Sequence, residues 1–281
     1  MDANDKYCAA LVHEADRERY LATLFAPADR RSALFSLYAF DIEISRIRDL
    51  AREPMPGEIR LQWWREVLEG ERAGEAAANP VAASLLATLA RYRLAPRNLA
   101  DLVEAHRFDL YDEPIASLSA LESYALDTAG RVFDCAARTL DEVFDAKAAA
   151  AEAGQARMLA NVIALLPRHA ARRQMFLPLD MLRQYGCGPD DVFAMQASSE
   201  LRAVLAELRL RARRHLARLA EMSADIPEKI WPAFLPLAPL RPWLNAMERT
   251  TYQPFQPPEL PAWRRQWRIW RAAKSFGRIG S

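Results

Sequence analysis

Glycine is scarce in this chain, at only 9 of 281 residues. No GxGxxG, GKS/GKT or GxSxG motif occurs, so the chain lacks the phosphate-binding loops and the nucleophile elbow of common α/β folds. Tight turns between strands also depend on glycine. Together with long stretches rich in Ala, Leu, Arg and Glu, this scarcity predicts an all-α protein.

Cysteine and histidine are too few and too scattered to suggest a metal site. Cys8, Cys135 and Cys187 form no CxxC pair, and the four histidines form no HExxH motif. We therefore expect neither a zinc site nor a disulfide framework, and no cofactor. The cysteine usage fits a reducing, cytoplasmic environment.

Long apolar runs and an excess of charge are also missing. No run approaches the roughly 20 apolar residues that a membrane-spanning helix needs, and the mean hydropathy is −0.19. The N-terminus has no apolar signal region. With 38 Lys and Arg against 37 Asp and Glu, the net charge is +1. Nucleic-acid binding driven by bulk charge is not expected.

Apolar residues instead recur with the 3.6-residue period of helices, interrupted by short breaks that contain proline or glycine. All connections are short, so we expect one domain, residues 1–281, with a basic, tryptophan-rich helix within 259–281. The predicted helices are 5–25, 28–50, 57–70, 80–93, 96–111, 118–141, 148–168, 198–222, 228–250 and 259–274.

A series of short segments follows an order that is typical of one enzyme family. The most informative is Leu37-Tyr38-Ala39-Phe40, and the others are Tyr20–Pro27, Gln62–Glu66, Asn79–Ala82, Phe108–Leu110, Leu121–Tyr124 and Arg172–Pro178. Over residues 7–250 the chain resembles the squalene/phytoene synthase family. The resemblance implies an all-α bundle of the isoprenoid synthase type around a central cavity.

Synthases of this family condense two prenyl diphosphates, and two aspartate-rich motifs on facing helices hold the magnesium ions that bind the diphosphate. The first motif follows the LYAF-like segment, and here Ser45, Arg46 and Asp49 occupy its aspartate positions. Asp41 shares a helical face with Asp49 but lies about 12 Å away along the axis, at about 1.5 Å per residue. That separation is too large for the two carboxylates to share one ion.

The second motif is equally changed. Counting back from the Phe176–Pro178 anchor places Leu165 and His169 at its two aspartate positions, one turn after Asn161. Magnesium prefers carboxylate and water oxygens, whereas here a single imidazole stands among arginines. The resemblance therefore assigns no catalytic residue. It implies that the following family-equivalent residues face the cavity: Tyr38, Asp41, Ser45, Asp49, Asn161, Leu165, His169, Arg172 and Arg173.

The complex I assembly factors are one branch of the superfamily that shares this pattern. They resemble the synthases in their helical bundle, but their aspartate motifs are incomplete. The chain is similar to them at Leu37–Ile44, Leu61–Arg65, Arg168–Asp180 and Ile226–Leu235. The resemblance implies a non-catalytic assembly factor whose partners are subunits or intermediates of NADH:quinone oxidoreductase. It also implies a peripheral position at the inner membrane.

Two alternatives stay open at this point. A working prenyltransferase would need magnesium held by carboxylates from elsewhere, such as Asp41, Asp49 and Asp109. A carrier would use the inherited cavity to hold an isoprenoid or another lipid without reacting it.

The C-terminal helix has a distinctive pattern. Trp263, Trp267 and Trp270 form one stripe, among Arg264, Arg268 and Arg271. Such a helix suits an anionic membrane surface, because indoles settle near headgroups and arginines meet anionic lipid. The same period also suits a last helix that packs its indoles onto the bundle.

Overall fold

The computed structural model describes residues 2–51, 53–111, 113–276 and 279. Helices joined by short connections account for its regular structure, and the described residues contain no β-strand, only one isolated bridge between Gln253 and Gln256. The prediction of an all-α fold is therefore confirmed.

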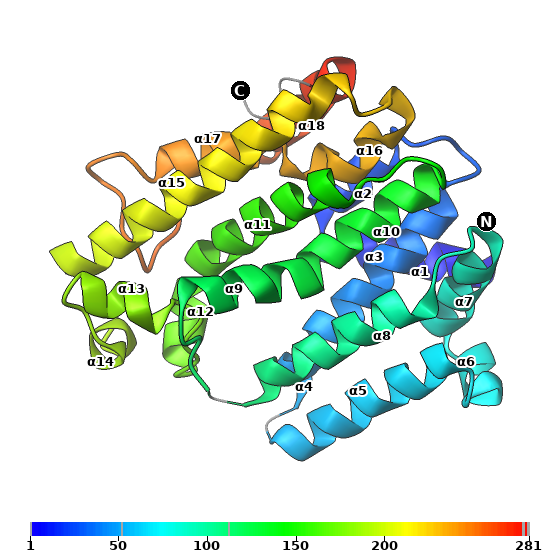
Figure 1. The fold of residues 1–281 in the computed structure, drawn as a ribbon, viewed down its shortest axis with the longest axis horizontal. Coiled ribbons are helices and arrows are strands. Elements are labelled where there is room, and N and C mark those ends of the chain that lie inside the picture. Colours follow the sequence, from blue (N-terminus) through cyan, green and yellow to red (C-terminus); the bar gives the residue numbers. More distant parts are fainter. Residues whose placement is uncertain (1, 52, 112, 277–278, 280–281) are drawn as a thin grey trace.

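The chain forms its helices in the following order (Figure 1). The first half contains α1 (Ala3–Ala15), α2 (Arg17–Thr23), α3 (Arg31–Ser45), α4 (Ile47–Leu50), α5 (Pro54–Glu69), α6 (Ala73–Ala78), α7 (Pro80–Arg91), α8 (Pro96–Ala105), the 3-10 helix η1 (His106–Leu110), α9 (Leu118–Ala125), the π-helical turn η2 (Leu126–Gly130) and α10 (Arg131–Leu140). The second half contains α11 (Lys147–Ala164), α12 (Leu166–Ala171), α13 (Leu179–Gln184), α14 (Pro189–Phe193), α15 (Ser199–Glu221), η3 (Met222–Ala224), η4 (Glu228–Ile230), α16 (Trp231–Phe234), η5 (Leu235–Leu237), α17 (Leu240–Ala246) and α18 (Ala262–Lys274).

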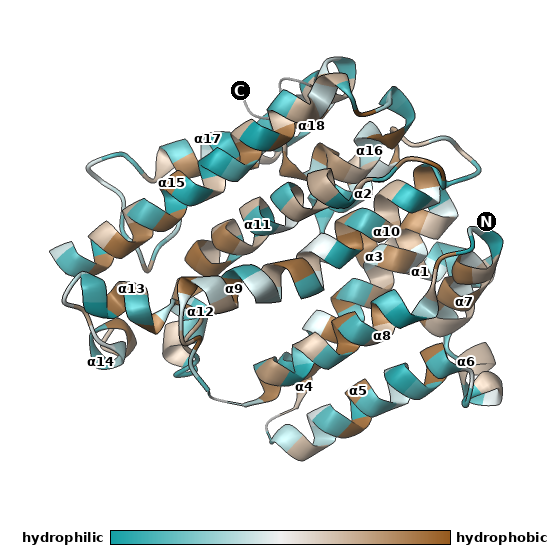
Figure 2. Cartoon of the chain, in the orientation of Figure 1, coloured by the Kyte–Doolittle hydropathy of each residue, from teal (hydrophilic) through white to brown (hydrophobic). Residues whose placement is uncertain are grey.

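The helices pack side by side into one bundle. Helix α11 packs along α15 and α10, and α10 also contacts α3. Helix α3 packs against α1 and α7, and α5 lies against α8 at the edge of the bundle. Figure 2 shows hydrophobic and hydrophilic residues alternating along α15 and α5, as expected for helices that cover a core. The C-terminal ends of α3 and α11 lead directly into α4 and α12, which carry the site described below.

Local side-chain chemistry sets several helix boundaries. The Asp16 carboxylate accepts a hydrogen bond from the Arg19 backbone N–H and starts α2, which divides the helix predicted at 5–25. Asn79 caps α7 in the same way, ahead of Pro80 at the first helical position. Gly70 ends α5 in the left-handed conformation, at a φ of 86°.

Two glycines allow an unusually close approach between α11 and the π-helical turn. A Cβ atom on Gly154 would lie 2.5 Å from the backbone nitrogen of Gly130 and 2.6 Å from its Cα. Both contacts are to backbone, which cannot move aside as a flexible side chain can. The packing of α11 against η2 thus requires glycine at position 154.

The sequence prediction fails most clearly at residues 228–250. Instead of one helix, the chain forms η4, α16, η5 and α17, because Pro232, Pro236, Pro239 and Pro242 each remove a backbone donor. The short helices α6, α13 and α14 were also not predicted. Their lengths of five or six residues leave too few turns for a periodic apolar pattern.

Candidate functional site

The two segments predicted to correspond to the aspartate motifs meet where α4 and α12 come together, and a charge cluster occupies the junction. Arg168 Nη2 donates to both carboxylate oxygens of Asp49, at 2.6 Å each. Arg172 Nη1 also donates to Asp49 Oδ1. The one acid left in the first motif is thus bound by two arginines that flank His169 of the second motif.

The other expected ligand positions carry groups that do not bind magnesium well. Ser45 is an exposed residue, and its hydroxyl donates to the Ile42 carbonyl oxygen at 3.2 Å. Leu165 is the residue that follows α11, and its side chain has no atom that could bind a metal ion. The His169 ring packs on Phe176, with the ring centroids 4.5 Å apart.

The protonation of His169 follows from its surroundings. Burial, and then the positive charge of Arg168, lower the pKa of His169 to about 4. The imidazole is therefore neutral at neutral pH, and its position beside two arginines opposes the arrival of a cation.

These residues do not fit the magnesium clamp of the family. Both oxygens of Asp49 are already engaged by guanidinium groups. In the part of the chain that the structure describes, no group of three or more His, Cys, Asp or Glu side chains is arranged to hold a metal ion. The cluster can instead bind the two helices to each other, or pair with acidic groups.

Arg173 does not join this cluster. It adopts a positive φ of 55°, and its guanidinium lies over the Phe193 ring, 4.7 Å from the centroid. It pairs with the exposed Asp190 on α14, at 3.8 Å. The cationic group predicted around His169 therefore splits, with Arg168 and Arg172 on Asp49 and Arg173 on α14.

Asp41, on α3, belongs to a second charge network, which is buried and separate from the Asp49 cluster. Arg19 Nη1 of α2 donates to Asp41 Oδ2 at 2.5 Å, and its guanidinium carbon lies 5.0 Å from the ring centroid of Tyr38. Asp16 pairs with Arg19 at 3.7 Å and with Arg157 of α11 at 3.3 Å. Burial raises the pKa of Tyr38, which stays a neutral phenol. Asp41 is therefore occupied by an ion pair within the core.

Asp109 is also engaged. It accepts a hydrogen bond from the Tyr124 hydroxyl at 2.7 Å and lies 2.7 Å from His106 Nδ1. Burial alone would lower the pKa of His106, but the Asp109 carboxylate raises it above its ordinary value. The three carboxylates of the prenyltransferase alternative thus have three separate sets of partners.

Arg19, His106 and Tyr124 were missed by sequence reasoning. Asp41 gave a partial signal, because a charged side chain on a largely apolar helix that is mostly buried requires a partner. Which cation supplies the pairing depends on how α2 packs on α3, and no local motif encodes that contact.

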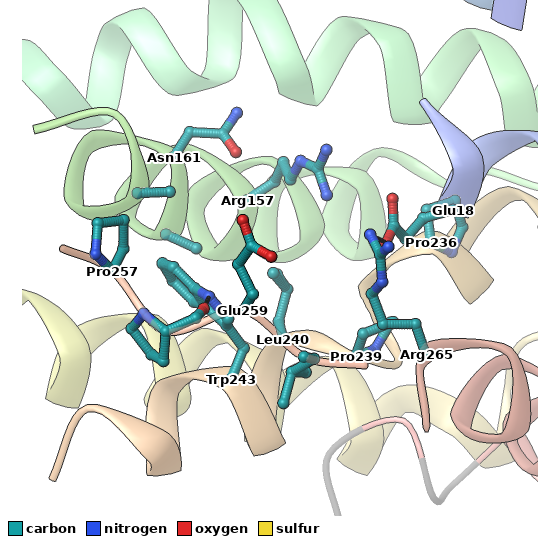
Figure 3. Close-up of a pocket in the computed structure, with 14 residues that line it drawn as sticks. Glu18, Arg157, Asn161, Pro236, Pro239, Leu240, Trp243, Pro257, Glu259 and Arg265 are labelled. Carbon is teal, nitrogen blue, oxygen red and sulfur yellow. Dashed lines mark hydrogen bonds and ion pairs between the residues drawn. The ribbon is translucent and has the colours of Figure 1, made fainter. Parts of the chain in front are cut away.

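A pocket of about 440 Å³ lies between α11 and the C-terminal segments (Figure 3). Arg157 and Asn161 line it from α11, facing Trp243 of α17 and Glu259. Arg265 of α18 closes one end through an ion pair with Glu18 at 2.7 Å. Of the residues expected to line the family cavity, this pocket includes Asn161.

The tryptophans of α18 point away from the bundle. Trp263, Trp267 and Trp270 are 63%, 45% and 51% exposed. The helix packs on the bundle through Ile269 and Ala272, each 1% exposed. Among the described residues, no helix is long and apolar enough to cross a membrane.

Comparison with known proteins gives a consistent family assignment. A family profile described as squalene/phytoene synthase matches residues 12–271. The chain is 29% identical over 254 residues to the human protein "NADH dehydrogenase (ubiquinone) complex I, assembly factor 6", covering 90% of this chain and 76% of that protein. It is 25% identical over 283 residues to phytoene synthase from Arthrospira platensis, covering 93% and 90%.

Solved structures share the fold. A dehydrosqualene synthase in complex with ligand matches with a TM-score of 0.82 at 20% identity, covering 97% of this chain and 96% of that one. A squalene synthase from Alicyclobacillus acidocaldarius matches with a TM-score of 0.75 at 22% identity, covering 90% and 95%. The predicted isoprenoid synthase fold in a single domain is therefore confirmed.

Proposed function

This chain belongs to the squalene/phytoene synthase family, and from that premise we propose that it is a non-catalytic assembly factor for NADH:quinone oxidoreductase, respiratory complex I. The observation that carries the proposal is the pairing of Asp49 with Arg168 and Arg172. Guanidinium groups occupy the carboxylate that a synthase of this family would use to hold magnesium.

Several independent changes point the same way. Ionisation of a prenyl diphosphate needs cations that neutralise the leaving group, and synthases supply them as carboxylate-bound magnesium. Here Leu165 and His169 cannot replace the second set of carboxylates, and Asp41 and Asp109 are bound elsewhere in the fold. The helical bundle itself is kept, so its surface remains available for protein partners.

The relatives support the choice of partner. The human, bovine, mouse and rat assembly factors for complex I are 28–29% identical to this chain, over 89–90% of its length. The family branch and the site chemistry together favour an assembly role at the inner membrane. The partners would be subunits or assembly intermediates of complex I.

A deletion strain tests the proposal directly. We expect loss of the protein to lower the amount of intact NADH:quinone oxidoreductase, measured by native gel and NADH oxidation in membranes. Squalene, hopanoid and carotenoid levels should not change. A normal respiratory complex with loss of an isoprenoid product would reject the assembly role.

Complementation with Asp49→Asn separates the assembly role from the enzyme alternative. A magnesium-dependent synthase needs this carboxylate as a ligand, whereas the assembly role needs only the folded bundle. We expect the variant to restore complex I, with the unfolding midpoint as a stability control. Pyrophosphate release from a prenyl diphosphate by the purified protein, abolished by Asp49→Asn, would contradict the proposal.

A further inference from the structure

Helix α18 presents an apolar face that the bundle does not cover. At about 100° per residue, Trp263, Trp267 and Trp270 lie within about 60° of one another. The centre of this stripe lies roughly 160° from Ile269 and Ala272, which are buried against the bundle. The three indoles therefore face outward on a helix whose opposite side is fixed.

The helix is firmly attached. It contacts α2 and η5, and Arg265 pairs with Glu18 of the neighbouring α2 region at 2.7 Å. Just beyond its end, the Phe276 ring stacks on Trp231, with centroids 5.6 Å apart. The exposure of the tryptophans thus reflects the packed position of α18.

The flank of the helix beside the tryptophans is cationic. Between Ala262 and Lys274 the sequence has five basic residues and no acid: Arg264, Arg265, Arg268, Arg271 and Lys274. The guanidinium of Arg264 lies 5.1 Å from the Trp263 ring centroid, and that of Arg271 lies 4.6 Å from the centroid of Trp267. Cation and indole are therefore presented side by side.

A groove of about 490 Å³ extends this surface between α17 and α18. The described residues that line it include no carboxylate and combine Arg249, Arg264 and Arg268 with Trp263 and Trp267. Burial, followed by the charges of Arg271 and Arg241, lowers the pKa of Arg268. Positive charges thus lie close together on this part of the surface.

We propose that the exposed tryptophans of α18 and the adjoining arginine groove form a docking surface for an anionic lipid bilayer. Indoles insert at the level of the headgroups, and arginines on the flank pair with lipid phosphates. A bilayer fits this surface better than an acidic protein does. Three indoles that face outward in a row can all insert into the continuous apolar interface that a bilayer offers. This inference does not depend on the assembly role, since the purified chain can bind vesicles without any client.

The surface lies away from the Asp49 cluster. Figure 1 shows α17 and α18 at one edge of the bundle, on the opposite side from α4 and α5. A chain docked through α18 therefore keeps the α4–α12 end of the bundle accessible.

Vesicle sedimentation with the full chain tests the surface. We expect binding to phosphatidylcholine vesicles that contain cardiolipin, and at least about tenfold weaker binding to phosphatidylcholine alone. Triple replacement of Trp263, Trp267 and Trp270 by Ala should reduce binding at both low and moderate salt. Double charge reversal, Arg264→Glu with Arg268→Glu, should weaken binding by about tenfold or more, mainly at low salt.

Matched control variants distinguish binding through this surface from nonspecific binding of the protein to vesicles. Arg60→Glu with Arg97→Glu makes the same change in net charge at exposed positions on α5 and α8. Met55→Ser, Ile59→Ser and Val143→Ser remove three other exposed apolar side chains. These controls should bind vesicles as the wild type does. Equal binding by the wild type and both α18 variants would overturn the proposal, as would a tryptophan-dependent dimer that does not bind vesicles.

Discussion

Arg168 and Asp49 are 119 residues apart in the sequence, yet their side chains meet with two contacts of 2.6 Å. The pair joins α12 to α4 at the position where the resemblance to the synthases places two facing sets of carboxylates. A cation from the second motif thus binds the surviving anion of the first. Four experiments follow from this and the neighbouring contacts.

Restoring the missing carboxylates should not by itself restore magnesium binding. In the variant Ser45→Asp, Leu165→Asp, His169→Asp, the guanidinium groups of Arg168 and Arg172 still occupy Asp49. We expect measurable magnesium or manganese binding only when Arg168→Ala and Arg172→Ala are added, because the arginines compete for the same oxygens. Calorimetry and manganese electron paramagnetic resonance would detect it.

The arginine double variant alone, with the native Ser45, Leu165 and His169, provides the control. It removes the competing cations without adding ligands, so it should bind no ion. Tight binding by the triple aspartate variant with both arginines intact would show that the arginines do not block the site.

The Arg19–Asp41 pair should be important for stability. Removing one partner leaves an uncompensated charge in the core, so Asp41→Leu should lower the free energy of unfolding by about 3 kcal/mol. The double variant Arg19→Met, Asp41→Leu removes both charges, and should be less destabilised than Asp41→Leu alone. Urea unfolding monitored by circular dichroism would measure both differences.

Arg19 also contacts Asp16, so a second carboxylate could compensate its charge when Asp41 is removed. This contact provides a test of how much the Arg19–Asp41 pair contributes. If Asp16 alone holds Arg19 in place, Asp41→Leu will cost less than about 1 kcal/mol, which is the range of solvent-exposed ion pairs. That result would refute a dominant role for the buried pair.

Gly154→Ala should destabilise the bundle, because the new methyl group would lie within 2.6 Å of backbone atoms of Gly130. Overpacking of this kind typically costs about 1–3 kcal/mol. Gly74→Ala on α6 is the matched control, since among the described residues no atom outside its chain neighbours and its own helix backbone lies within 4 Å of the position that its methyl group would take. That change should be neutral or stabilise by up to about 1 kcal/mol. Equal unfolding midpoints for the two variants would contradict the close packing.

His169 should make the fold less stable in mild acid. Its pKa in the folded chain is lowered to about 4, below the ordinary value of 6.5, so the unfolded chain binds the proton more readily. Stability is therefore lost as the pH falls from about 6.5 to about 4, by up to about 3 kcal/mol. The difference in unfolding free energy between wild type and His169→Gln, followed across this range, isolates the contribution.

His106 contributes with the opposite sign. The Asp109 carboxylate raises its pKa in the folded chain, so its stabilising effect is present at low pH and is lost as the pH rises through that folded value. If the unfolding free energy of His169→Gln depends on pH as steeply as that of the wild type, other groups cause the acid sensitivity.

The sequence predicted the helices with long amphipathic patterns well, and it singled out Asp49 and Arg172, which the structure brings together. It could not predict that Arg168 and Arg172 turn toward Asp49 while Arg173 turns toward Phe193, because the direction depends on how α12 ends. It also left two interpretations of the α18 tryptophans. Their period is the same whether they face the bundle or solvent, and only the packing of Ile269 and Ala272 distinguishes the two.

The arginine cluster at Asp49 also changes what the α4–α12 junction responds to. Where a clamp is made of diffusible magnesium, its occupancy follows the free ion concentration and the arrival and departure of a diphosphate. Here the positive charge is covalently part of the chain, at a fixed stoichiometry of two guanidinium groups to one carboxylate. The junction is therefore closed as soon as the chain folds, and chelators or substrate analogues have nothing to remove from it.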